Sequence, residues 1–336
     1  MRMKECLSYD DVLLAPQYSD IVSRKEVSLK SSLAPFEFEL PVISSPMDTV
    51  TGPSMSNAMS AAGGLGIIHR YCSVDEQAKM IRDSNAEVKA AAVGVTGDYH
   101  ERALALVAMG ASVLCVDVAH GHHILMKNAL EQLRETFGNT VHLMAGNVAT
   151  LAGINDLADW GANSVRCNIG GGSICSTRVQ TGHGLPGLQT LFDCSQTDRD
   201  VTIIADGGIR TSGDAVKALA AGADFVMLGS MLAGTIETPG SVIHTTDGKT
   251  KKIYRGMASK EAQHDWRGKH SSFEGVATTV PMAGPVEHIL GDIKNGIRSG
   301  LSYSGARTIA ELQAKACFVR QTNAGTTESA PHILLK

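Results

Sequence analysis

The sequence contains no apolar run long enough to cross a lipid bilayer. A membrane-spanning helix needs roughly 18 or more consecutive apolar residues, and no window of this chain approaches that length. The first residues, MRMKECLSYDD, also lack the uninterrupted apolar stretch of a secretory signal peptide. We therefore expect a cytoplasmic protein with no membrane partner.

An excess of positive charge is also lacking. The 30 Lys and Arg residues against 34 Asp and Glu give a formal net charge of −4, and basic clusters such as Lys249, Lys251 and Lys252 are short. Binding to nucleic acid depends strongly on neutralising phosphates with Lys and Arg. The composition therefore predicts no nucleic-acid partner.

Paired cysteines are missing as well. The seven cysteines are odd in number and widely spread, and none belongs to a C-x-x-C motif. Disulfide frameworks and thiolate zinc sites both depend on cysteines at characteristic spacings. The sequence therefore predicts neither, and favours a reducing compartment.

What the sequence does contain is a series of eight short apolar runs that alternate with helical stretches. Continuous apolar character is typical of parallel strands that are buried on both faces. No low-complexity linker interrupts the series, so residues 1–336 are expected to form a single α/β domain, a (β/α)8 or TIM barrel; a doubly wound open sheet is the alternative. The runs are residues 39–47, 64–70, 90–97, 112–121, 141–150, 163–170, 201–209 and 225–234.

Local signals agree with helices between these strands. Ser73 and Glu76 have the spacing of a capping box, and Pro53 suits the first turn of a helix. A Gly-Ala pair at Gly110, Gly161 and Gly222 precedes three of the strands. Each of these glycines is expected to end a helix with a positive φ angle.

Polar residues follow the ends of the expected strands. In a (β/α)8 barrel the carboxyl ends of all strands meet at one mouth, and the loops after the last two strands often bind phosphate. Small residues there let backbone N–H groups approach the phosphate oxygens. The sequence therefore predicts a phosphorylated small ligand at a mouth formed by Asp48, Asp117, His120, Asn147, Asp206, Gly207, Gly208, Gly229 and Ser230.

A glycine-rich segment, GGGSICSTRVQTGHGLP at residues 170–186, surrounds one cysteine. Three consecutive glycines from Gly170 permit backbone conformations that are closed to residues with a Cβ atom. Cys175 is then expected on a loop, where a thiol can act as a nucleophile. The alternative is that Cys175 is one more small buried residue.

Several motifs together resemble the inosine monophosphate dehydrogenase and GMP reductase family along nearly the whole chain. They are GGGSICSTR, SSPMDTVTG, GGLGIIHR, VDVAHGHH, AGNVAT, IADGGIRTSGD, VMLGSMLAG and YRGM. The resemblance implies a (β/α)8 barrel, usually in homotetramers, and a loop cysteine that attacks C2 of a purine nucleotide to give a covalent thioimidate. Dehydrogenases oxidise IMP with NAD⁺ and hydrolyse this adduct to XMP. Reductases release ammonia from GMP to reach the same adduct, which they reduce with NADPH to IMP.

Three residues match catalytic positions of the family. Cys175 resembles the nucleophile, Thr177 the hydroxyl that helps to activate water or ammonia, and Glu274 the acid/base glutamate. Covalent catalysis by a thiolate needs a proton shuttle for the group that leaves or attacks. The resemblance implies that Thr177 and Glu274 supply it.

A nucleotide site is implied in the same way. Asp206 corresponds to the carboxylate that accepts the two ribose hydroxyls, although by itself it could also cap a helix, just as Tyr254 could be a packed aromatic. The residues expected around the phosphate are Ser173, Gly208, Gly229, Ser230 and Tyr254. Those expected along the base and sugar are Ser45, Met47, Gly256 and Met257.

A cofactor site is implied beside it. Asp117 corresponds to the cofactor-side carboxylate, and His120 and Gly170 would border NADPH or NAD. His120 also stands in an H-x-H-H cluster, whose spacing gives awkward tetrahedral geometry for zinc.

A monovalent cation such as K⁺ is implied instead of zinc. Its ligands would be the backbone carbonyls of Gly170, Gly172 and Cys175, with residues 328–330 contributed by a neighbouring subunit.

Two departures from the dehydrogenases bear on the reaction. Between Arg70 and Ala90 there is no room for the regulatory CBS modules that dehydrogenases commonly insert, and the flap, about residues 258–274, has no Arg-Tyr pair to activate water. A short flap without that base favours reduction, because a reductase must keep water off the adduct. The expected activity is therefore GMP reductase.

Two alternatives to GMP reductase stay open. VDVAHGHH, DGGIR, YRGM and FVRQTNAGTTES read more like dehydrogenases, so IMP dehydrogenase is the main alternative. In that case Arg267, in HDWRGKH, would be a displaced water-activating arginine. A catalytically idle nucleotide-binding barrel is the third possibility, which the intact set of Cys175, Thr177 and Glu274 disfavours.

Overall fold

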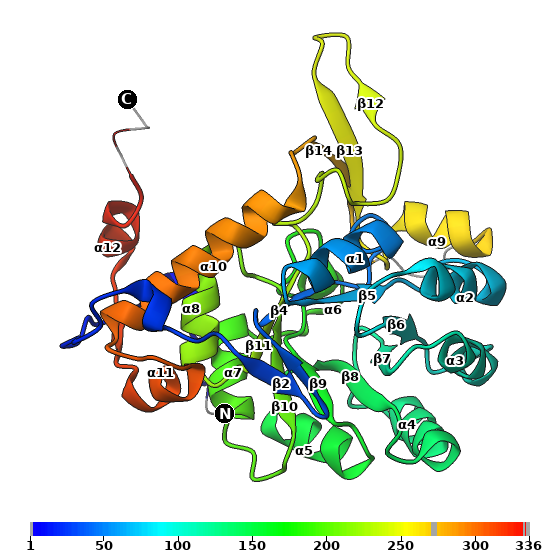
Figure 1. The fold of residues 1–336 in the computed structure, drawn as a ribbon, viewed down its shortest axis with the longest axis horizontal. Helices are drawn as coiled ribbons and strands as arrows, with labels where there is room; N and C mark the ends of the chain where they lie inside the picture. Colours follow the sequence, from blue (N-terminus) through cyan, green and yellow to red (C-terminus); the bar gives the residue numbers. More distant parts are fainter. Residues whose placement is uncertain (1–2, 270–273, 332, 334–336) are drawn as a thin grey trace.

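The computed structural model describes residues 3–269, 274–331 and 333, and its centre is a closed barrel of eight parallel strands (Figure 1). The strands pair in the order β10-β11-β4-β5-β6-β7-β8-β9. This confirms the predicted (β/α)8 barrel, and the open-sheet alternative is wrong. The strands are β4 (Val42–Ser44), β5 (Leu65–Ile68), β6 (Ala90–Val93), β7 (Val113–Asp117), β8 (His142–Val148), β9 (Ser164–Cys167), β10 (Thr202–Asp206) and β11 (Phe225–Leu228).

Both faces of these strands are buried, which explains their continuous apolar sequence. In β6, Ala90 and Ala92 belong to the core inside the barrel, whereas Ala91 and Val93 belong to the core between the barrel and its helices. Successive side chains of a strand point to opposite faces. Because each face meets a separate apolar core, no polar alternation is left in the sequence.

Eight helices cover the outside of the barrel (Figure 1). The expected capping box of Ser73 and Glu76 begins α2, and Pro53 is the first residue of α1. Gly110, Gly161 and Gly222 have φ angles of 99°, 106° and 107°, as predicted. The helices are α1 (Pro53–Ala61), α2 (Val74–Asp83), α3 (Tyr99–Ala108), α4 (Ile124–Phe137), α5 (Leu151–Asp159), α7 (Gly187–Cys194), α8 (Ser212–Ala220) and α10 (Val286–Tyr303).

Other elements extend the barrel. The hairpin β2 (Ser31–Leu33) and β3 (Phe36–Phe38) packs Leu33 and Phe38 into the inner core, and a three-stranded antiparallel sheet of β12 (Ile243–His244), β13 (Thr250–Arg255) and β14 (Ala277–Pro281) projects from the body (Figure 1). The remaining elements are β1 (Val12–Leu14), which pairs with β15 (Phe318–Arg320), the helices α6 (Thr177–Thr181), α9 (Lys260–Arg267), α11 (Ile309–Lys315) and α12 (Asn323–Glu328), and the short 3-10 helices at Tyr9–Asp11 and Arg24–Glu26.

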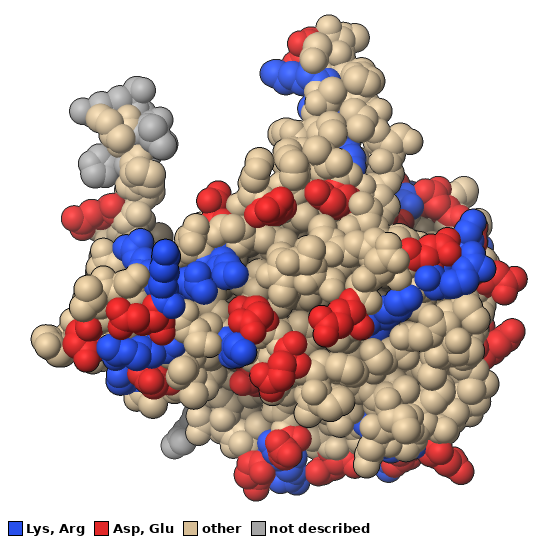
Figure 2. Space-filling view, viewed as in Figure 1, with Lys and Arg blue, Asp and Glu red and all other residues tan. Residues whose placement is uncertain are grey.

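The surface carries charges of both signs. Figure 2 shows Lys and Arg side chains interspersed with Asp and Glu on one face of the molecule. Several of these charges form exposed ion pairs, for example Arg307 with Asp20 and Arg210 with Asp10. Among the described helices, none combines the length and the apolar character that crossing a membrane requires.

Candidate active site

A cavity of about 260 Å³ opens at the carboxyl ends of the barrel strands. It collects residues from the loops after β4, β7, β9, β10 and β11, together with residues of the projecting sheet and the flap. Nearly all the site residues expected from the sequence line it. They are Ser45, Met47, Asp117, Asn147, Gly170, Gly172, Ser173, Cys175, Thr177, Asp206, Gly207, Gly208, Gly229, Ser230, Tyr254, Gly256, Met257 and Glu274.

The glycine loop after β9 owes its shape to two of its glycines. Gly170 has a φ of +79°, and a Cβ atom on Gly171 would lie 2.0 Å from the Asn168 side-chain nitrogen. Arg178, on α6, fastens the loop by donating to the Ile169 carbonyl at 3.2 Å and to the Leu185 carbonyl. Side chains at both glycines are therefore excluded, as the sequence predicted for this run.

The loop presents the thiol at the head of a hydrogen-bonded row. Cys175 Sγ lies 3.1 Å from Thr177 Oγ1, which donates to Glu274 Oε2 at 2.8 Å. Cys175 is exposed, so the alternative of a buried core cysteine is wrong. Thiol, hydroxyl and carboxylate can thus exchange a proton along one line.

Backbone bonds bring together these residues from distant parts of the chain. Glu274 is 97 positions from Thr177. Ser176 N donates to the Glu274 carbonyl at 2.9 Å, and Val276 N donates to the Ile174 carbonyl at 3.0 Å. The strand-like pairing positions the Glu274 carboxylate against the loop that carries Cys175.

A buried arginine connects the two expected ligand carboxylates. Arg166 on β9 is 6% exposed; its Nε and Nη2 donate to Asp206 Oδ2 at 3.1 and 2.8 Å, and its Nη1 donates to Asp117 Oδ1. Burial alone would lower the pKa of Arg166, but the two carboxylates hold it well above its usual range. Asn147 Nδ2 also donates to Asp206 Oδ2, at 2.8 Å. All three of these Asp206 bonds converge on Oδ2, and Oδ1 takes no part in them.

Asp206 does not cap the helix that follows it. The helix that follows it, α8, is capped by the Thr211 side chain, which accepts from Asp214 N at 3.1 Å. The helix-cap alternative for Asp206 is therefore wrong.

Arg166 and Arg70 were not expected in the site from the sequence. Arg70 lines the same cavity; its Nη2 donates to the Asp117 carbonyl at 3.1 Å, and its Nε lies 3.8 Å from Asp117 Oδ2. The available signal for Arg166 was an arginine inside the otherwise apolar run SVRC. A charge within a strand that is buried on both faces requires a partner.

Small residues leave space where the phosphate is expected. A Cβ atom on Gly229 would lie 3.2 Å from Tyr254 Oη and 3.3 Å from Ser45 Oγ. Tyr254 is buried, its hydroxyl lies 3.5 Å from Ser173 Oγ, and burial raises its pKa while the Ser173 bond opposes that rise. The hydroxyls of Ser45, Ser173 and Tyr254 therefore lie around the space next to Gly229, which is open because glycine has no side chain.

The histidine cluster lies apart from this cavity. His120 is exposed and does not line it; burial of its ring, and then the neighbouring His122, His123 and His183, lower its pKa. His123 instead caps α4 by accepting from Leu125 N at 3.1 Å, and His122 pairs with Asp156 at 2.7 Å. Within the described residues, no group of three or more His, Cys, Asp or Glu is arranged to hold a metal ion.

The expected cation site involves carbonyls of the glycine loop. One of them, the Gly172 carbonyl, accepts from Cys175 N at 3.1 Å. Two of the three expected ligands, Gly172 and Cys175, therefore lie in one tight turn, and K⁺ binding there stays a prediction.

Aromatic stacking holds the described part of the flap beside the site. Trp266 of α9 packs on Tyr71 with ring centroids 4.5 Å apart, and the Arg70 guanidinium lies 5.5 Å from the Trp266 ring. Arg267 is exposed, stacks 4.2 Å from the Trp266 ring and does not line the cavity that holds Cys175. The part of the expected flap at residues 270–273 lies outside the described residues.

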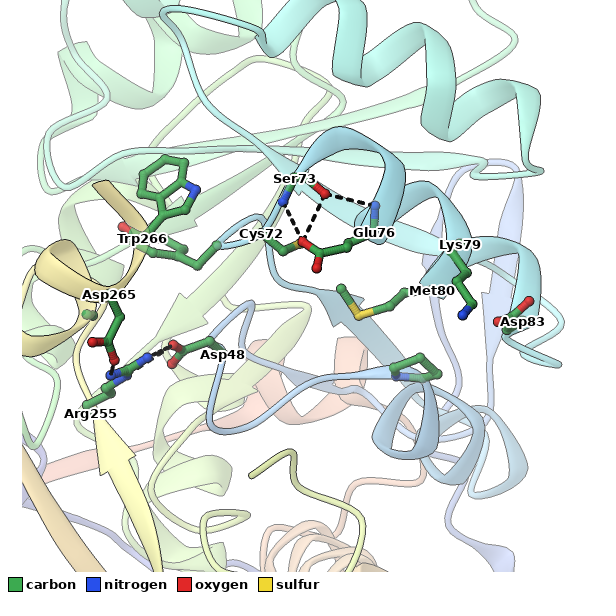
Figure 3. A pocket seen from close by; sticks show the side chains of 13 residues that line it. Asp48, Cys72, Ser73, Glu76, Lys79, Met80, Asp83, Arg255, Asp265 and Trp266 are labelled. Atoms are coloured by element: carbon green, nitrogen blue, oxygen red, sulfur yellow. Dashed lines mark hydrogen bonds and ion pairs between the residues drawn. The ribbon is translucent and has the colours of Figure 1, made fainter. Parts of the chain in front are cut away.

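A larger cavity, about 650 Å³, lies between the flap helix α9, α2 and the loop after β4 (Figure 3). Asp48 lies here, where Arg255 joins it to Asp265, rather than in the cavity that holds Cys175. Tyr71 lines both cavities. Cys175, Thr177 and Glu274, the residues expected to be catalytic, line the smaller of the two.

Comparison with known proteins identifies the family to which this chain belongs. The family model described as "IMP dehydrogenase / GMP reductase domain" matches residues 6–332. The chain belongs to this family. Family members are oxidoreductases that use NAD or NAD(P)H, which agrees with a thiol-centred cavity at the mouth of a barrel.

Individual members of the IMP dehydrogenase / GMP reductase family carry both names. The chain is 34% identical to an inosine-5'-monophosphate dehydrogenase of Nitrosopumilus maritimus, with 100% of both chains covered. It is 32% identical to a GMP reductase of Leishmania major, with 99% of this chain and 98% of the relative covered. A crystal structure of a Trypanosoma brucei GMP reductase variant with guanosine 5'-monophosphate superposes with a TM-score of 0.93 at 32% identity, over 98% of each chain.

The alignment also bears on the expected absence of an inserted module. It runs over 476 positions with the Nitrosopumilus maritimus relative, whereas this chain has 336 residues, so that relative has residues with no counterpart here. In this chain, the connection between β5 and β6 consists of α2 and short loops.

Proposed function

We propose that the chain is a GMP reductase that converts GMP and NADPH to IMP, ammonia and NADP⁺. The observation that carries the proposal is the Cys175–Thr177–Glu274 row in a cavity whose two arginines, Arg70 and Arg166, both contact Asp117. The row supplies a nucleophile and a route for its proton. Arg166 is held between the Asp117 and Asp206 carboxylates, which supports the view that it does not act as a base toward water.

The first half of the reaction uses this row. The Cys175 thiolate forms a C–S bond to C2 of GMP, and Glu274, through the Thr177 hydroxyl, delivers a proton to the amine on C2. The C–N bond then breaks and ammonia leaves, which gives the thioimidate adduct.

In the second half the adduct is reduced. NADPH, when bound, supplies the hydride for C2; the C–S bond breaks, and Cys175 is released as the thiolate. Asp117, His120 and Gly170 are the residues that we expect beside the nicotinamide nucleotide. By donating to both carboxylates, Arg166 fixes the positions of Asp117 and Asp206 relative to each other.

The remaining site residues would bind the nucleotide. The Asp206 carboxylate would accept the ribose hydroxyls through Oδ1, since Oδ2 already takes bonds from Arg166 and Asn147. The phosphate would lie against Ser173, Ser230, Tyr254 and the backbone of Gly208 and Gly229, and the base and sugar against Ser45, Met47, Gly256 and Met257.

IMP dehydrogenase is the second candidate, and the relative from Nitrosopumilus maritimus favours it. It would require a base for the hydrolytic water. Arg267, the flap arginine considered for that role, stacks on Trp266 outside the catalytic cavity. This placement supports reduction over hydrolysis.

The proposal is tested by measuring whether the covalent adduct is hydrolysed to XMP or reduced to IMP. The protein is incubated with GMP in the absence of NADPH, and ammonia, XMP and nucleotide-modified Cys175 are quantified after a quench. We expect ammonia and the adduct with little XMP, because general-base help is typically worth about 10² to 10⁴ in rate. Adding NADPH should then release IMP. Rapid accumulation of XMP would contradict the proposal.

A Glu274→Gln variant tests the proton route in the same assay. It should slow ammonia release more than hydride transfer, since the carboxyl protonates the leaving amine. Glu261→Gln, at an exposed glutamate of the flap helix, is the control and should leave both steps unchanged.

A further inference from the structure

Lys252, on β13, has a buried ammonium group that no catalytic step uses. The residue is 4% exposed, and its Nζ donates to the carbonyls of Thr235, Ile236 and Thr238 at 2.9, 3.2 and 2.7 Å. A fourth acceptor, Thr238 Oγ1, lies at 3.2 Å. An ammonium has three N–H donors, so these four oxygens satisfy it completely.

The acceptors are neutral oxygens rather than carboxylates. Among the described residues no ion pair to Lys252 is present. A buried charge is costly unless hydrogen bonds satisfy it, and three converging carbonyls do so in the way that they would bind a free cation. The Lys252 ammonium therefore stabilises the backbone turn at residues 235–238.

That turn continues from the expected phosphate site. The Gly229 carbonyl accepts from Leu232 N at 3.0 Å, and the Leu232 carbonyl accepts from Thr235 Oγ1 at 2.9 Å. The Thr235 carbonyl accepts from Thr238 Oγ1 at 2.8 Å as well as from Lys252. An unbroken series of hydrogen bonds thus runs from Gly229 to the ammonium.

The strand that carries Lys252 also contributes a residue to the expected phosphate site. Lys252 and Tyr254 are two positions apart on β13, so their side chains lie on one face of the strand. Tyr254 places its hydroxyl beside Ser173 and Gly229. The turn is also held by the segment that follows β14, since Ala283 N donates to the Gly234 carbonyl at 2.8 Å.

We infer that Lys252 is a positioning residue for the nucleotide phosphate: it joins the turn of residues 229–238 to β13 and sets the spacing between Gly229, Ser230 and the Tyr254 hydroxyl. It does not touch the substrate. The inference rests on the proposed function, because that function places the phosphate between these groups.

A Lys252→Met variant tests this role, with Lys249→Met as the control. Lys249 is an exposed lysine of the same projecting sheet region, so the control removes one positive charge without disturbing the turn. We expect Lys252→Met to weaken GMP binding by about tenfold or more, because hydrogen bonds to a charged group are lost. Binding of guanosine, which has no phosphate, should be unchanged in both variants.

Chemical rescue provides a second readout. In Lys252→Ala, added ethylammonium should restore GMP affinity, whereas tetramethylammonium at equal ionic strength should not, because it has the charge but no N–H donor. If neither Lys252 variant folds, Thr238→Ala tests the same link, since it removes one acceptor and keeps the ammonium; a selective loss of GMP affinity is expected.

The outcomes separate this inference from the proposed function. Wild-type protein that binds neither GMP nor IMP would overturn both. Normal wild-type binding with unchanged GMP affinity in the Lys252 variants, or in Thr238→Ala where only that variant folds, would overturn the role of Lys252 alone. An equal loss of GMP and guanosine, or rescue by both ammonium ions alike, would also contradict it.

Discussion

Cys175 differs from the other cysteines of the chain in its surroundings. It is exposed on a loop and bonded to Thr177, whereas Cys115, Cys167 and Cys194 are buried in the core. Cys175→Ala and Cys175→Ser should abolish turnover, because neither a methyl nor a hydroxyl group replaces a thiolate as nucleophile. Nucleotide binding and folding should survive.

Steady-state rates and GMP titrations check this prediction. Cys317→Ala, at the other exposed cysteine among the described residues, is the matched control and should keep full activity. If Cys175→Ala retained a substantial part of the wild-type rate, covalent catalysis at this residue would be wrong.

Asp206 provides the second prediction at this scale. Asp206→Ala should weaken GMP binding by several kcal/mol, since two ribose hydroxyls lose a charged acceptor and such bonds are worth about 1.5 to 3 kcal/mol each. The wild type should also bind 2'-deoxy-GMP poorly. Calorimetric titration with both nucleotides measures this, with Asp200→Ala, an exposed aspartate before β10, as the control. Equal affinities for GMP and its deoxy analogue would count against the role of Asp206.

Individual site residues were predictable to the extent that they stand in motifs. The thiol, hydroxyl and carboxylate of the catalytic row were expected, and the structure brings them within hydrogen-bond distance. Arg166 was missed because it stands in a strand whose other residues are small or apolar and mask the charge in the sequence pattern. His120 does not line the cavity that holds Cys175, and its place beside the cofactor stays a prediction.

The flap is the element on which the choice of reaction depends. Its helix α9 is held by the Trp266–Tyr71 stack and by Arg255, which links Asp265 to Asp48. Trp266→Ala should loosen this contact, admit water to the adduct and raise the XMP fraction, with reduction slowed by up to about 10²-fold through misplacement.

Product analysis of the quenched reaction checks the flap prediction. Arg267→Ala is the control, because this side chain stacks on Trp266 from an exposed position and should leave the ratio of IMP to XMP unchanged. XMP formation that depends on Arg267 would instead identify a relocated hydrolytic base.

Elements with strong local signals were the predictable ones. The eight barrel strands were identified because each is a continuous apolar run bounded by helix caps or glycines. The hairpin β2–β3 and the sheet β12–β13–β14 were not, because their strands are partly exposed and do not form continuous apolar runs. Their stability comes from contacts such as Phe38 against Phe225, which are distant in sequence.

At the scale of the whole molecule, the barrel and the elements around it leave several large apolar side chains exposed. Tyr18 and Val22 are 91% and 95% exposed on one N-terminal segment. Such side chains are often covered in an assembly. We predict a homotetramer, and light scattering should give four times the chain mass of 35.4 kDa.

Val22→Asp tests whether this segment forms the contact. It should shift the scattering mass toward smaller species, since a buried carboxylate without a partner is costly at an interface. A wild-type protein that is monomeric at high concentration, with or without GMP, would contradict the predicted assembly.

The most direct test of the proposed activity is a paired assay on one preparation of the wild-type protein. GMP is offered with NADPH, and IMP is offered with NAD⁺, while nucleotide products and ammonia are quantified. The account predicts IMP and ammonia in equal amounts from the first mixture, and little XMP from the second. Vigorous XMP formation from IMP and NAD⁺, with no ammonia from GMP and NADPH, would contradict it and identify a compact dehydrogenase.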